Sequence, residues 1–309
     1  MDVVSDAVSA IRIGRPSSNR VRVGGSWCTR LAPYDGAGFH VVLEGSCWLL
    51  PDGGPPVSLG AGDVVLLPHG TGHVIADAPA DAATVSQAAP FERWLAGTTG
   101  PQLPQAACGN VEMLCGKYRL DRSRIHPLMA ELPKVVHLPN RVGAHVELRA
   151  AVDLLGHELG NQRPGACIAV PSLLDLLLVY MIRSWAAQGS GTWPTVLGDP
   201  VAAAALRALH SDLAAPWTND RLAAEAGVSR ATLARRFTTL VGRPPMAYLT
   251  WWRLTFAATL LRDTPYPLAT IARRVGYGTP YALSHAFSRE FGTTPGQYRA
   301  STAGQSASM

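Results

Sequence analysis

Apolar and polar positions alternate in the first third of the chain. Between residues 20 and 95, short apolar or alternating runs are separated by glycine, proline and aspartate, which is typical of strands joined by tight turns. The runs are Phe39–Leu43, Cys47–Leu50, Asp63–Leu67 and His73–Ala76, and Val111–Tyr118 and Val135–Leu138 continue the pattern. This rhythm predicts a small β-barrel or sandwich.

Around Glu147 the apolar period lengthens to that of a helix. Apolar residues recur at helical spacing from Val146 to Leu159, and Pro171 is expected to open a second helix that runs to about Ala187. The second helix carries a wide apolar stripe, formed by Leu173, Leu174, Leu177, Leu178 and Met181. The stripe is wider than one partner helix requires, so we expect a homodimer with palindromic or directly repeated binding sites.

Small, flexible residues then divide the chain. We expect residues 1–187 to form a sensor and dimerisation domain, residues 188–198 a linker, and residues 199–300 a helical domain. Residues 301–309 are small and polar, and we expect them to be disordered. The fold class is therefore a multidomain α and β protein, with a β-barrel and following helices before an all-α C-terminal domain.

The composition of the 309 residues, 47% hydrophobic and 16% charged, is typical of a folded soluble protein. No run of 18 apolar residues occurs, and the first ten residues contain two aspartates and no basic residue. We therefore expect neither a transmembrane helix nor a secretory signal, and a cytoplasmic protein without a membrane partner. The odd number of cysteines, five, does not suggest a disulfide framework in such a protein, and the absence of a CxxC pair argues against a zinc finger.

The positive charge is concentrated in the C-terminal third. Residues 198–300 carry 12 arginines and 6 acidic residues, whereas residues 1–197 carry 15 basic and 16 acidic residues. A basic domain joined to a nearly neutral one indicates a polyanionic partner, for which we expect double-stranded DNA; a merely arginine-rich surface is the alternative.

The basic region contains an internal repeat of helix, turn and helix. One copy runs from Leu222 to Phe237 and the other from Ile271 to Phe287, with glycine expected to end the first helix of each. Ser229 and Thr279 are suitable N-caps for the second helices. The copies are offset by 49 residues before the turn and 50 after it, so the second turn holds one extra residue.

The outer faces of the second helices carry small and hydrogen-bonding groups. These are Arg230, Ala231, Ala234, Arg235 and Thr238 in the first copy, and Tyr281, Ser284, His285 and Ser288, flanked by Arg289, in the second. Such a face fits a major groove, although two ordinary helical hairpins are the alternative. The apolar helix between the copies would hold them apart at a fixed angle. Two recognition helices about 34 Å apart would then meet the same face of a DNA duplex, one helical turn apart.

The region resembles the DNA-binding domain of the AraC/XylS family of transcription regulators. The run LAAEAGVSRATLARRF and the closing Phe287–Arg299 stretch carry the resemblance. It implies seven helices with two helix-turn-helix units, a sequence-specific regulator and no enzymatic activity. By position, Ala231, Ala234, Arg235, Tyr281, Ser284 and His285 would face bases, with Arg235 on guanine; Arg230, Arg236, Arg289 and the Thr218 cap would contact phosphates.

Residues 62–77 resemble the second cupin motif, with Gly62, Pro68, Gly70 and His73 at the expected intervals. The first motif is incomplete, because His40 is preceded by Gly38 and Glu44 comes too late to bind a metal. Only His40 and His73 are in place for a metal ion, whereas three or four ligands are normal. We therefore expect a ligand-sensing barrel with no certain cofactor, and keep a metal-dependent cupin enzyme with an accessory DNA-binding domain as the alternative.

Residues 107–138 resemble a cupin-containing subgroup of the same family, some members of which sense reactive chlorine or other oxidants through cysteine. Cys108 and Cys115 are seven residues apart, so a regular strand would place them on opposite faces. They could form a redox pair across a turn, Cys115 could join His40 and His73 in a metal site, or both could be small core residues. The signal is thus a small molecule or an oxidant, and we expect an activator that contacts RNA polymerase, although the residues do not distinguish it from a repressor.

Overall fold

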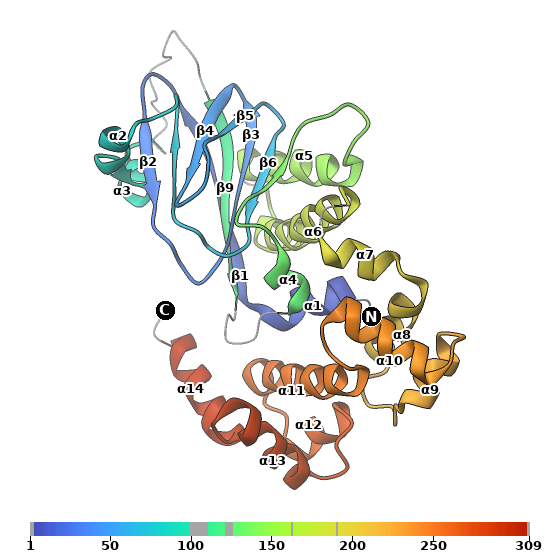
Figure 1. The fold of residues 1–309 in the computed structure, drawn as a ribbon. Coiled ribbons are helices and arrows are strands. Elements are labelled where there is room, and N and C mark those ends of the chain that lie inside the picture. The colour runs from blue at the N-terminus through green and yellow to red at the C-terminus, as the bar shows by residue number, and fades with distance from the viewer. Residues whose placement is uncertain (1–2, 99–110, 121–125, 162, 190, 308–309) are drawn as a thin grey trace. The chain divides into compact units, whose positions relative to one another are not determined.

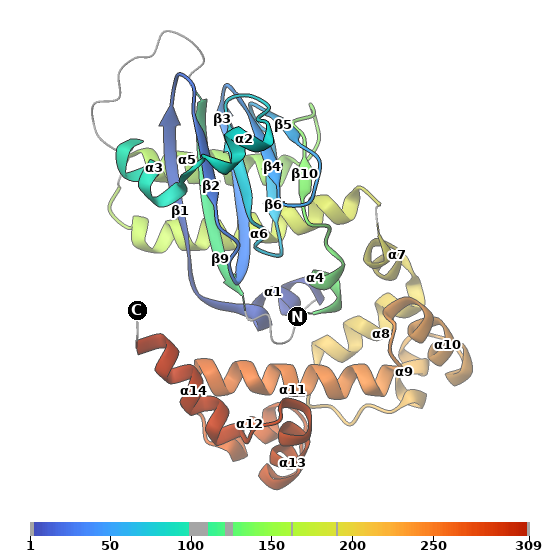
Figure 2. The same ribbon diagram turned by 60° about the vertical axis from the view of Figure 1, so that its left-hand side comes forward.

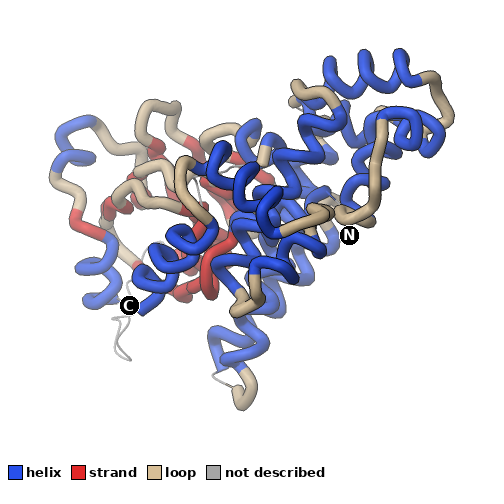
Figure 3. Tube along the Cα trace, turned by 90° about the horizontal axis from the view of Figure 1, so that it is seen from below, coloured by secondary structure: helices blue, strands red, loops and turns tan. Residues whose placement is uncertain are grey.

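The computed structural model describes residues 3–98, 111–120, 126–161, 163–189 and 191–307 (Figure 1). The chain divides into two units by its internal contacts. The barrel unit comprises residues 12–125 and 129–188, and the helical unit comprises residues 1–11, 126–128 and 189–309. In Figure 3 the described strands all belong to the barrel unit, whereas the helical unit consists of helices and loops.

Two five-stranded sheets form the barrel unit (Figure 2). The first has the order β1 (Arg12–Val23), β9 (Val111–Leu120), β3 (Gly36–Glu44), β6 (Val64–Leu67) and β10 (Val136–Leu138). The second has the order β5 (Val57–Gly60), β4 (Ser46–Pro51), β7 (His73–Ala76), β2 (Cys28–Leu31) and β8 (Ala89–Pro90). The predicted barrel and its six predicted strands are confirmed, with strand ends that differ by up to three residues.

Strand β1 was not recognisable from the pattern of apolar residues. Its central residues, Pro16 to Arg20, are polar or proline, and the strand lies at the edge of its sheet with β9 as its one sheet neighbour. From Gly14 to Val23, the part of β1 whose side chains are described, the buried residues are Val21 and Val23, near its end. An edge strand can be polar because one side faces no other strand, so composition does not mark it.

The barrel core is built from the inward side chains of both sheets. Leu49, Val65, Ile75 and Met113 are fully buried there, together with the aromatic ring of Trp27. Two short helices, α2 (Ala82–Ser86) and α3 (Phe91–Thr98), occupy part of the region expected to be strands. Trp94 of α3 packs on Trp27 with ring centroids 5.4 Å apart, which anchors α3 beside β2.

Helices α5 (Val146–Asn161) and α6 (Ala166–Ala187) pack together and against β1 (Figures 1 and 2). The expectation that Pro171 opens the second helix was wrong, because α6 begins five residues earlier and contains the proline. Pro171 lies in the second turn of α6, so the helix lacks the backbone hydrogen bond that this position would donate to the carbonyl oxygen of Cys167. Helix α6 is long and apolar enough to cross a membrane by length and composition alone, a criterion that core helices of folded domains also meet.

The apolar stripe of α6 is largely used within the barrel unit. Leu174, Leu177, Leu178 and Met181 are buried by the unit itself, so they do not indicate a second subunit. The exposed apolar side chains of the two helices are Val146, Leu154, Ile168 and Leu176. A short helix, α4 (Pro127–Glu131), precedes β10.

Nine helices are described in the helical unit. They are α1 (Val3–Ile11), α7 (Thr192–Gly198), α8 (Pro200–Ser211), α9 (Asn219–Glu225), α10 (Arg230–Val241), α11 (Pro245–Asp263), α12 (Leu268–Arg274), α13 (Pro280–Phe291) and α14 (Pro295–Ala307). Seven of them follow Asp199, as expected. Within the expected linker, residues 192–198 form α7, in which Trp193 and Val196 are buried. The tail expected to be disordered continues α14 to Ala307.

Gly116 of β9 provides a test of the barrel packing. A Cβ atom on Gly116 would overlap the ring of Phe39 and the carbonyl oxygen of Ser17. We expect Gly116→Ala to lower the free energy of unfolding of the barrel unit by about 1–3 kcal/mol, because both neighbours belong to paired strands. Urea denaturation of the full chain measures this change. Gly60→Ala is the control, since its Cβ would meet nothing within 4 Å, and an equal loss in both variants would contradict the packing.

Candidate DNA-binding interface

The first helix-turn-helix unit is formed by α9 and α10. The hydroxyl oxygen of Thr218 accepts the backbone N–H of Arg221, and that of Ser229 accepts the N–H of Thr232, so both helices have the predicted N-caps. Gly227 has φ +65°, and the next N–H, of Val228, donates to Ala223 at 3.0 Å. The glycine is required because this left-handed turn disfavours a side chain.

The second unit, α12 and α13, repeats this geometry. Gly276 has φ +77°, and the N–H of Tyr277 donates to Ala272 at 2.8 Å, as Val228 does to Ala223. Thr279 caps α13 by accepting the N–H of Ala282. Because the N-cap comes three residues after the glycine here and two in the first unit, the extra residue predicted for the second turn is confirmed.

Two arginines hold the loops that precede the two units. Arg253 of α11 donates to the carbonyl oxygens of Leu213 and Ala215, at 2.9 and 2.8 Å. Arg299 of α14 does the same for Leu261 and Tyr266, at 3.2 and 2.6 Å. Arg253 therefore satisfies two carbonyls of the loop before α9, whereas Arg299 satisfies one carbonyl near the end of α11 and one in the loop before α12.

Helix α11 connects the two units. Much of its length is buried, including Tyr248, Trp251 and Trp252 towards the first unit and Leu260 and Leu261 in the core of the second. Its 19 residues span about 28 Å at 1.5 Å per residue. Arg253 also passes beside Gly276, where a Cβ atom would meet its guanidinium, so this residue contacts both units. The predicted role of this helix as a rigid spacer fits these contacts.

The residues predicted to face bases lie on the sides of α10 and α13 that the core does not use. Leu233 and Phe237 of α10, and Leu283 and Phe287 of α13, are buried. Among the predicted contacts, Ala231, Arg235 and His285 are exposed, Ala234 and Ser284 are half-buried, and Tyr281 is 81% exposed. Both sets of side chains are therefore accessible to a ligand.

The arginines predicted to contact phosphates differ in their exposure and in the ion pairs that they form. Arg236 forms an ion pair with Asp199 at 3.0 Å, and Asp199 also caps α8, so Arg236 holds α10 against the start of α8. Arg230 lies 3.8 Å from Asp220, with both side chains exposed, a separation at which surface pairs contribute little. Arg289 is exposed, and no ion pair of Arg235 is recorded in the part of the chain that the structure describes.

Inside the barrel, His40 of β3, His73 of β7 and Cys115 of β9 lie next to one another. His40 Nδ1 is 3.0 Å from Cys115 Sγ, and His40 Nε2 is 2.8 Å from His73 Nε2. The remaining ring nitrogen, His73 Nδ1, lies 2.9 Å from the carbonyl oxygen of Thr71. The juxtaposition of Cys115 with the two histidines was one of the alternatives derived from the sequence.

The direction of these hydrogen bonds follows from charge. Burial lowers the pKa of His73 to about 4 and the pKa of His40 well below its ordinary value, so both rings are neutral at pH 7. His73 must donate through Nδ1 to Thr71, so its Nε2 accepts from His40, whose Nδ1 then accepts from the thiol of Cys115. Burial raises the pKa of Cys115, which keeps this thiol protonated.

This arrangement does not fit a cupin metal centre. His40 and His73 direct their Nε2 atoms at each other, and Cys115 lies at the opposite edge of the His40 ring. Gly38 has no side chain. The Tyr34 hydroxyl lies 2.9 Å from the position that a Cβ atom on Gly38 would occupy, and this hydroxyl has no hydrogen-bond partner in the described region. Within that region no group of three or more His, Cys, Asp or Glu side chains could hold a metal ion.

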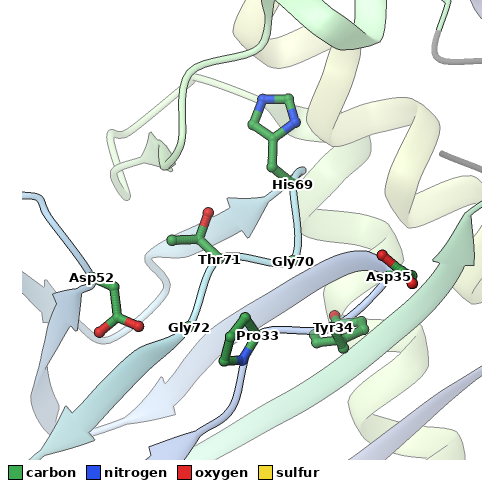
Figure 4. Close-up of a pocket in the computed structure, with 8 residues that line it drawn as sticks. All are labelled: Pro33, Tyr34, Asp35, Asp52, His69, Gly70, Thr71 and Gly72. Atoms are coloured by element: carbon green, nitrogen blue, oxygen red, sulfur yellow. The ribbon is translucent and has the colours of Figure 1, made fainter.

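A pocket of about 460 Å³ opens at one end of the barrel (Figure 4). Its lining is formed by two loops and one further carboxylate: Pro33, Tyr34, Asp35, Asp52, His69, Gly70, Thr71 and Gly72. Thr71 connects the pocket to the buried hydrogen bonds, because its carbonyl oxygen accepts from His73. The pocket was not predicted from the sequence, where the loops read only as turns. Cys108, the other predicted redox residue, lies outside the described residues.

Comparison with known proteins agrees with both parts of the structure. Residues 2–187 match a family described as Cupin, and residues 222–301 match a family described as Helix-turn-helix domain. The chain belongs to the AraC family of DNA-binding transcription regulators and has an N-terminal cupin domain.

Its relatives are similar over almost the whole chain. A putative AraC-like transcription regulator of Streptomyces antibioticus is 33% identical over 308 residues, which are 97% of this chain and 98% of the relative. The HTH-type transcriptional regulator MtrA of Neisseria gonorrhoeae is 30% identical over 97% of this chain and 98% of the relative. A solved DNA-binding domain of AdpA, in complex with a target DNA, is 36% identical over 35% of this chain and 96% of that chain, with a TM-score of 0.33.

The buried histidines make the stability of the barrel sensitive to acid. The pKa of His73 is about 4 in the folded chain and near 6.5 when unfolded, so its contribution is complete above pH 6.5 and is lost as the pH falls towards 4. This histidine alone should cost about 2 kcal/mol of unfolding free energy between pH 7.5 and pH 5. Urea denaturation at the two pH values measures the loss. We expect a smaller loss for His73→Gln and an unchanged loss for the exposed His157→Gln; equal losses in all three chains would contradict the burial.

Proposed function

We propose that this regulator reads two successive major grooves with α10 and α13. The observation that supports the proposal is the repeated geometry of the two units, in which capped recognition helices present small and polar side chains away from the core. Arg235, Tyr281 and His285 are long, exposed side chains on these faces. Arg235 is assigned to guanine, because a guanidinium can bind both acceptors of that base, worth about 1–3 kcal/mol of discrimination.

Backbone positioning is assigned to the residues around these helices. Arg230 and Arg289 flank the recognition faces and are exposed, which suits contact with phosphates. Thr218 caps the start of α9, and we assign that helix start to a phosphate, as helix N-termini favour anions. Arg236 is given a supporting role instead, because its ion pair with Asp199 holds α10 in place.

We place the signal in the barrel, at the pocket formed by Tyr34, Asp35, Asp52 and the loop 69–72. Its volume is in the range of small-molecule sites, and it adjoins the hydrogen bonds that run to Cys115. A small molecule is favoured over an oxidant, since a buried protonated thiol reacts slowly. The cupin enzyme alternative gains no support, as the two histidines bond to each other. Activation, contact with RNA polymerase and a cytoplasmic location stay predictions.

A homodimer is proposed through α5 and α6. The support is the exposed apolar side chains of these helices, of which Ile168 is 78% exposed and Leu154 is 56% exposed. Large exposed apolar side chains on neighbouring elements are typical of subunit contacts. A dimer would double the number of grooves that the protein reads.

Specific DNA binding is tested by gel shift of the full chain on fragments of its own upstream DNA. With excess nonspecific competitor, we expect Arg235→Ala to weaken the specific complex roughly tenfold or more, because a base contact is lost. Arg163→Ala, which removes the same charge from an exposed position of the barrel unit, should bind as the wild type does. Unchanged affinity of Arg235→Ala would contradict its place in the groove, and failure of the wild type to bind any DNA at low salt would contradict the proposed function.

The dimer is tested by sedimentation of the full chain. Ile168→Glu should shift the molecules from dimer to monomer at micromolar concentration, because a charge would have to be buried at the contact. Gln188→Glu adds the same charge at the end of α6 and should leave the dimer intact. A wild-type chain that sediments as a monomer would contradict the proposed contact.

A further inference from the structure

Four segments of the helical unit meet at a second buried chain of polar side chains. Asp6 comes from α1, His126 from the segment 126–128, His210 from α8 and Tyr248 from α11. Their exposures are 3%, 1%, 5% and 0%, so none is available to solvent. Two of the segments come from the N-terminal part of the sequence, far from the helix-turn-helix region that they join.

The hydrogen bonds of this chain are short and continuous. Leu128 N donates to His126 Nδ1 at 3.1 Å, and His126 Nε2 lies 3.0 Å from the Tyr248 hydroxyl. That hydroxyl lies 2.8 Å from His210 Nε2, and His210 Nδ1 lies 2.6 Å from a carboxylate oxygen of Asp6. The Trp193, Trp251 and Trp252 rings surround His126 at 5.3–5.7 Å and exclude water.

The hydrogen bonds between these four side chains run in one donor-to-acceptor direction, from His126 to Asp6. His126 accepts through Nδ1, and its pKa is lowered well below the ordinary value by burial, so the neutral ring donates through Nε2 to Tyr248. With a neutral His210 ring, the Tyr248 hydroxyl donates to His210 Nε2, and His210 Nδ1 donates to Asp6. The other oxygen of Asp6, Oδ1, has no partner in the described region. The carboxylate therefore depends on His210, and His210 on Tyr248.

Both ends of this chain lie next to one strand pair of the barrel in the sequence. Helix α1 ends at Ile11, directly before Arg12 of β1, and Arg12 pairs with Leu120, the last residue of β9. His126 follows Leu120 by six residues. The middle of the chain contacts a recognition helix, because the Tyr248 ring packs edge-on against Phe237 of α10, with centroids 5.7 Å apart.

We propose that the Asp6–His210–Tyr248–His126 chain couples the β1–β9 strand pair to the first recognition helix. A displacement at the shared end of β1 and β9 would pull Asp6 or His126 from its partner. Loss of either partner leaves buried polar groups unsatisfied, and a directional chain responds by rearranging as a whole. Tyr248 then moves against Phe237, which shifts α10 and leaves α13 in place. The functional part of this inference rests on the proposed function, because the coupling would change the affinity of the protein for DNA.

The first measurement is amide hydrogen exchange of the full-length protein. Asp6→Leu and Tyr248→Phe should each accelerate exchange in both α1 and α10, on the order of fivefold or more, and leave α13 unchanged. Tyr266→Phe removes a hydroxyl from the same unit outside the chain and should alter neither α1 nor α10. Acceleration confined to the mutated helix, or spread equally over α10 and α13, would overturn the proposal.

The second measurement links the chain to the barrel. Gly116→Ala disturbs β9, and we expect it to change both α10 exchange and specific DNA affinity in the wild-type background, by about fivefold or more. In the Tyr248→Phe background the same substitution should change neither. If Gly116→Ala changes α10 exchange and DNA affinity equally in the wild-type and Tyr248→Phe proteins, and both still bind DNA specifically, the coupling is overturned. A failure of the wild-type chain to bind DNA would instead refute the proposed function, and the exchange measurement would still decide the coupling.

Discussion

The burial of α11 is the constraint on which the helical unit depends. This one helix supplies aromatic side chains to the core of the first helix-turn-helix unit and aliphatic side chains to the core of the second. Neither recognition helix can change its angle to α11 without exposing part of that surface. Arg253 adds a polar constraint, because it holds the loop before α9 and lies against the turn at Gly276. A fixed spacing between the two units is the physical requirement for reading two grooves of one duplex.

Buried histidine chains occur in both units, and they solve the same physical problem. A neutral imidazole has one donor and one acceptor, so it can pass a hydrogen bond through a dry core without carrying a charge. In the barrel the chain ends at the backbone carbonyl of Thr71, which lines a pocket; in the helical unit it ends at the Asp6 carboxylate. The barrel thus keeps the cupin framework, and its two motif histidines form hydrogen bonds.

The barrel and the helical unit are not simply successive in the sequence. Residues 1–11 and 126–128 belong to the helical unit, although the strands that follow and precede them belong to the barrel. Asp6 and His126 are therefore held by tertiary contacts with α8 and α11, and their chemistry is visible only in the folded chain. With segments arranged in this way, the polypeptide connects the two units three times in addition to the link near Gln188.

Local patterns in the sequence determined the repeating parts of this protein. The glycines at 227 and 276, the N-caps at Ser229 and Thr279, and the alternating strands β3, β4, β6 and β7 each follow from interactions within a few residues. The same patterns predicted that His40, His73 and Cys115 could meet. They did not reveal β1, because an edge strand needs few apolar residues, nor the helix over 192–198.

Tertiary structure alone decided which polar residues are buried together. Asp6, His126, His210 and Tyr248 are separated by up to 242 residues, and none belongs to a motif. Their pairing depends on how α1, α8 and α11 pack, which no local period encodes. Likewise, the ion pair between Arg236 and Asp199 depends on how α8 and α10 pack. The sequence determined the elements and the family, because those depend on neighbouring residues; packing decided the buried chains, because they depend on distant ones.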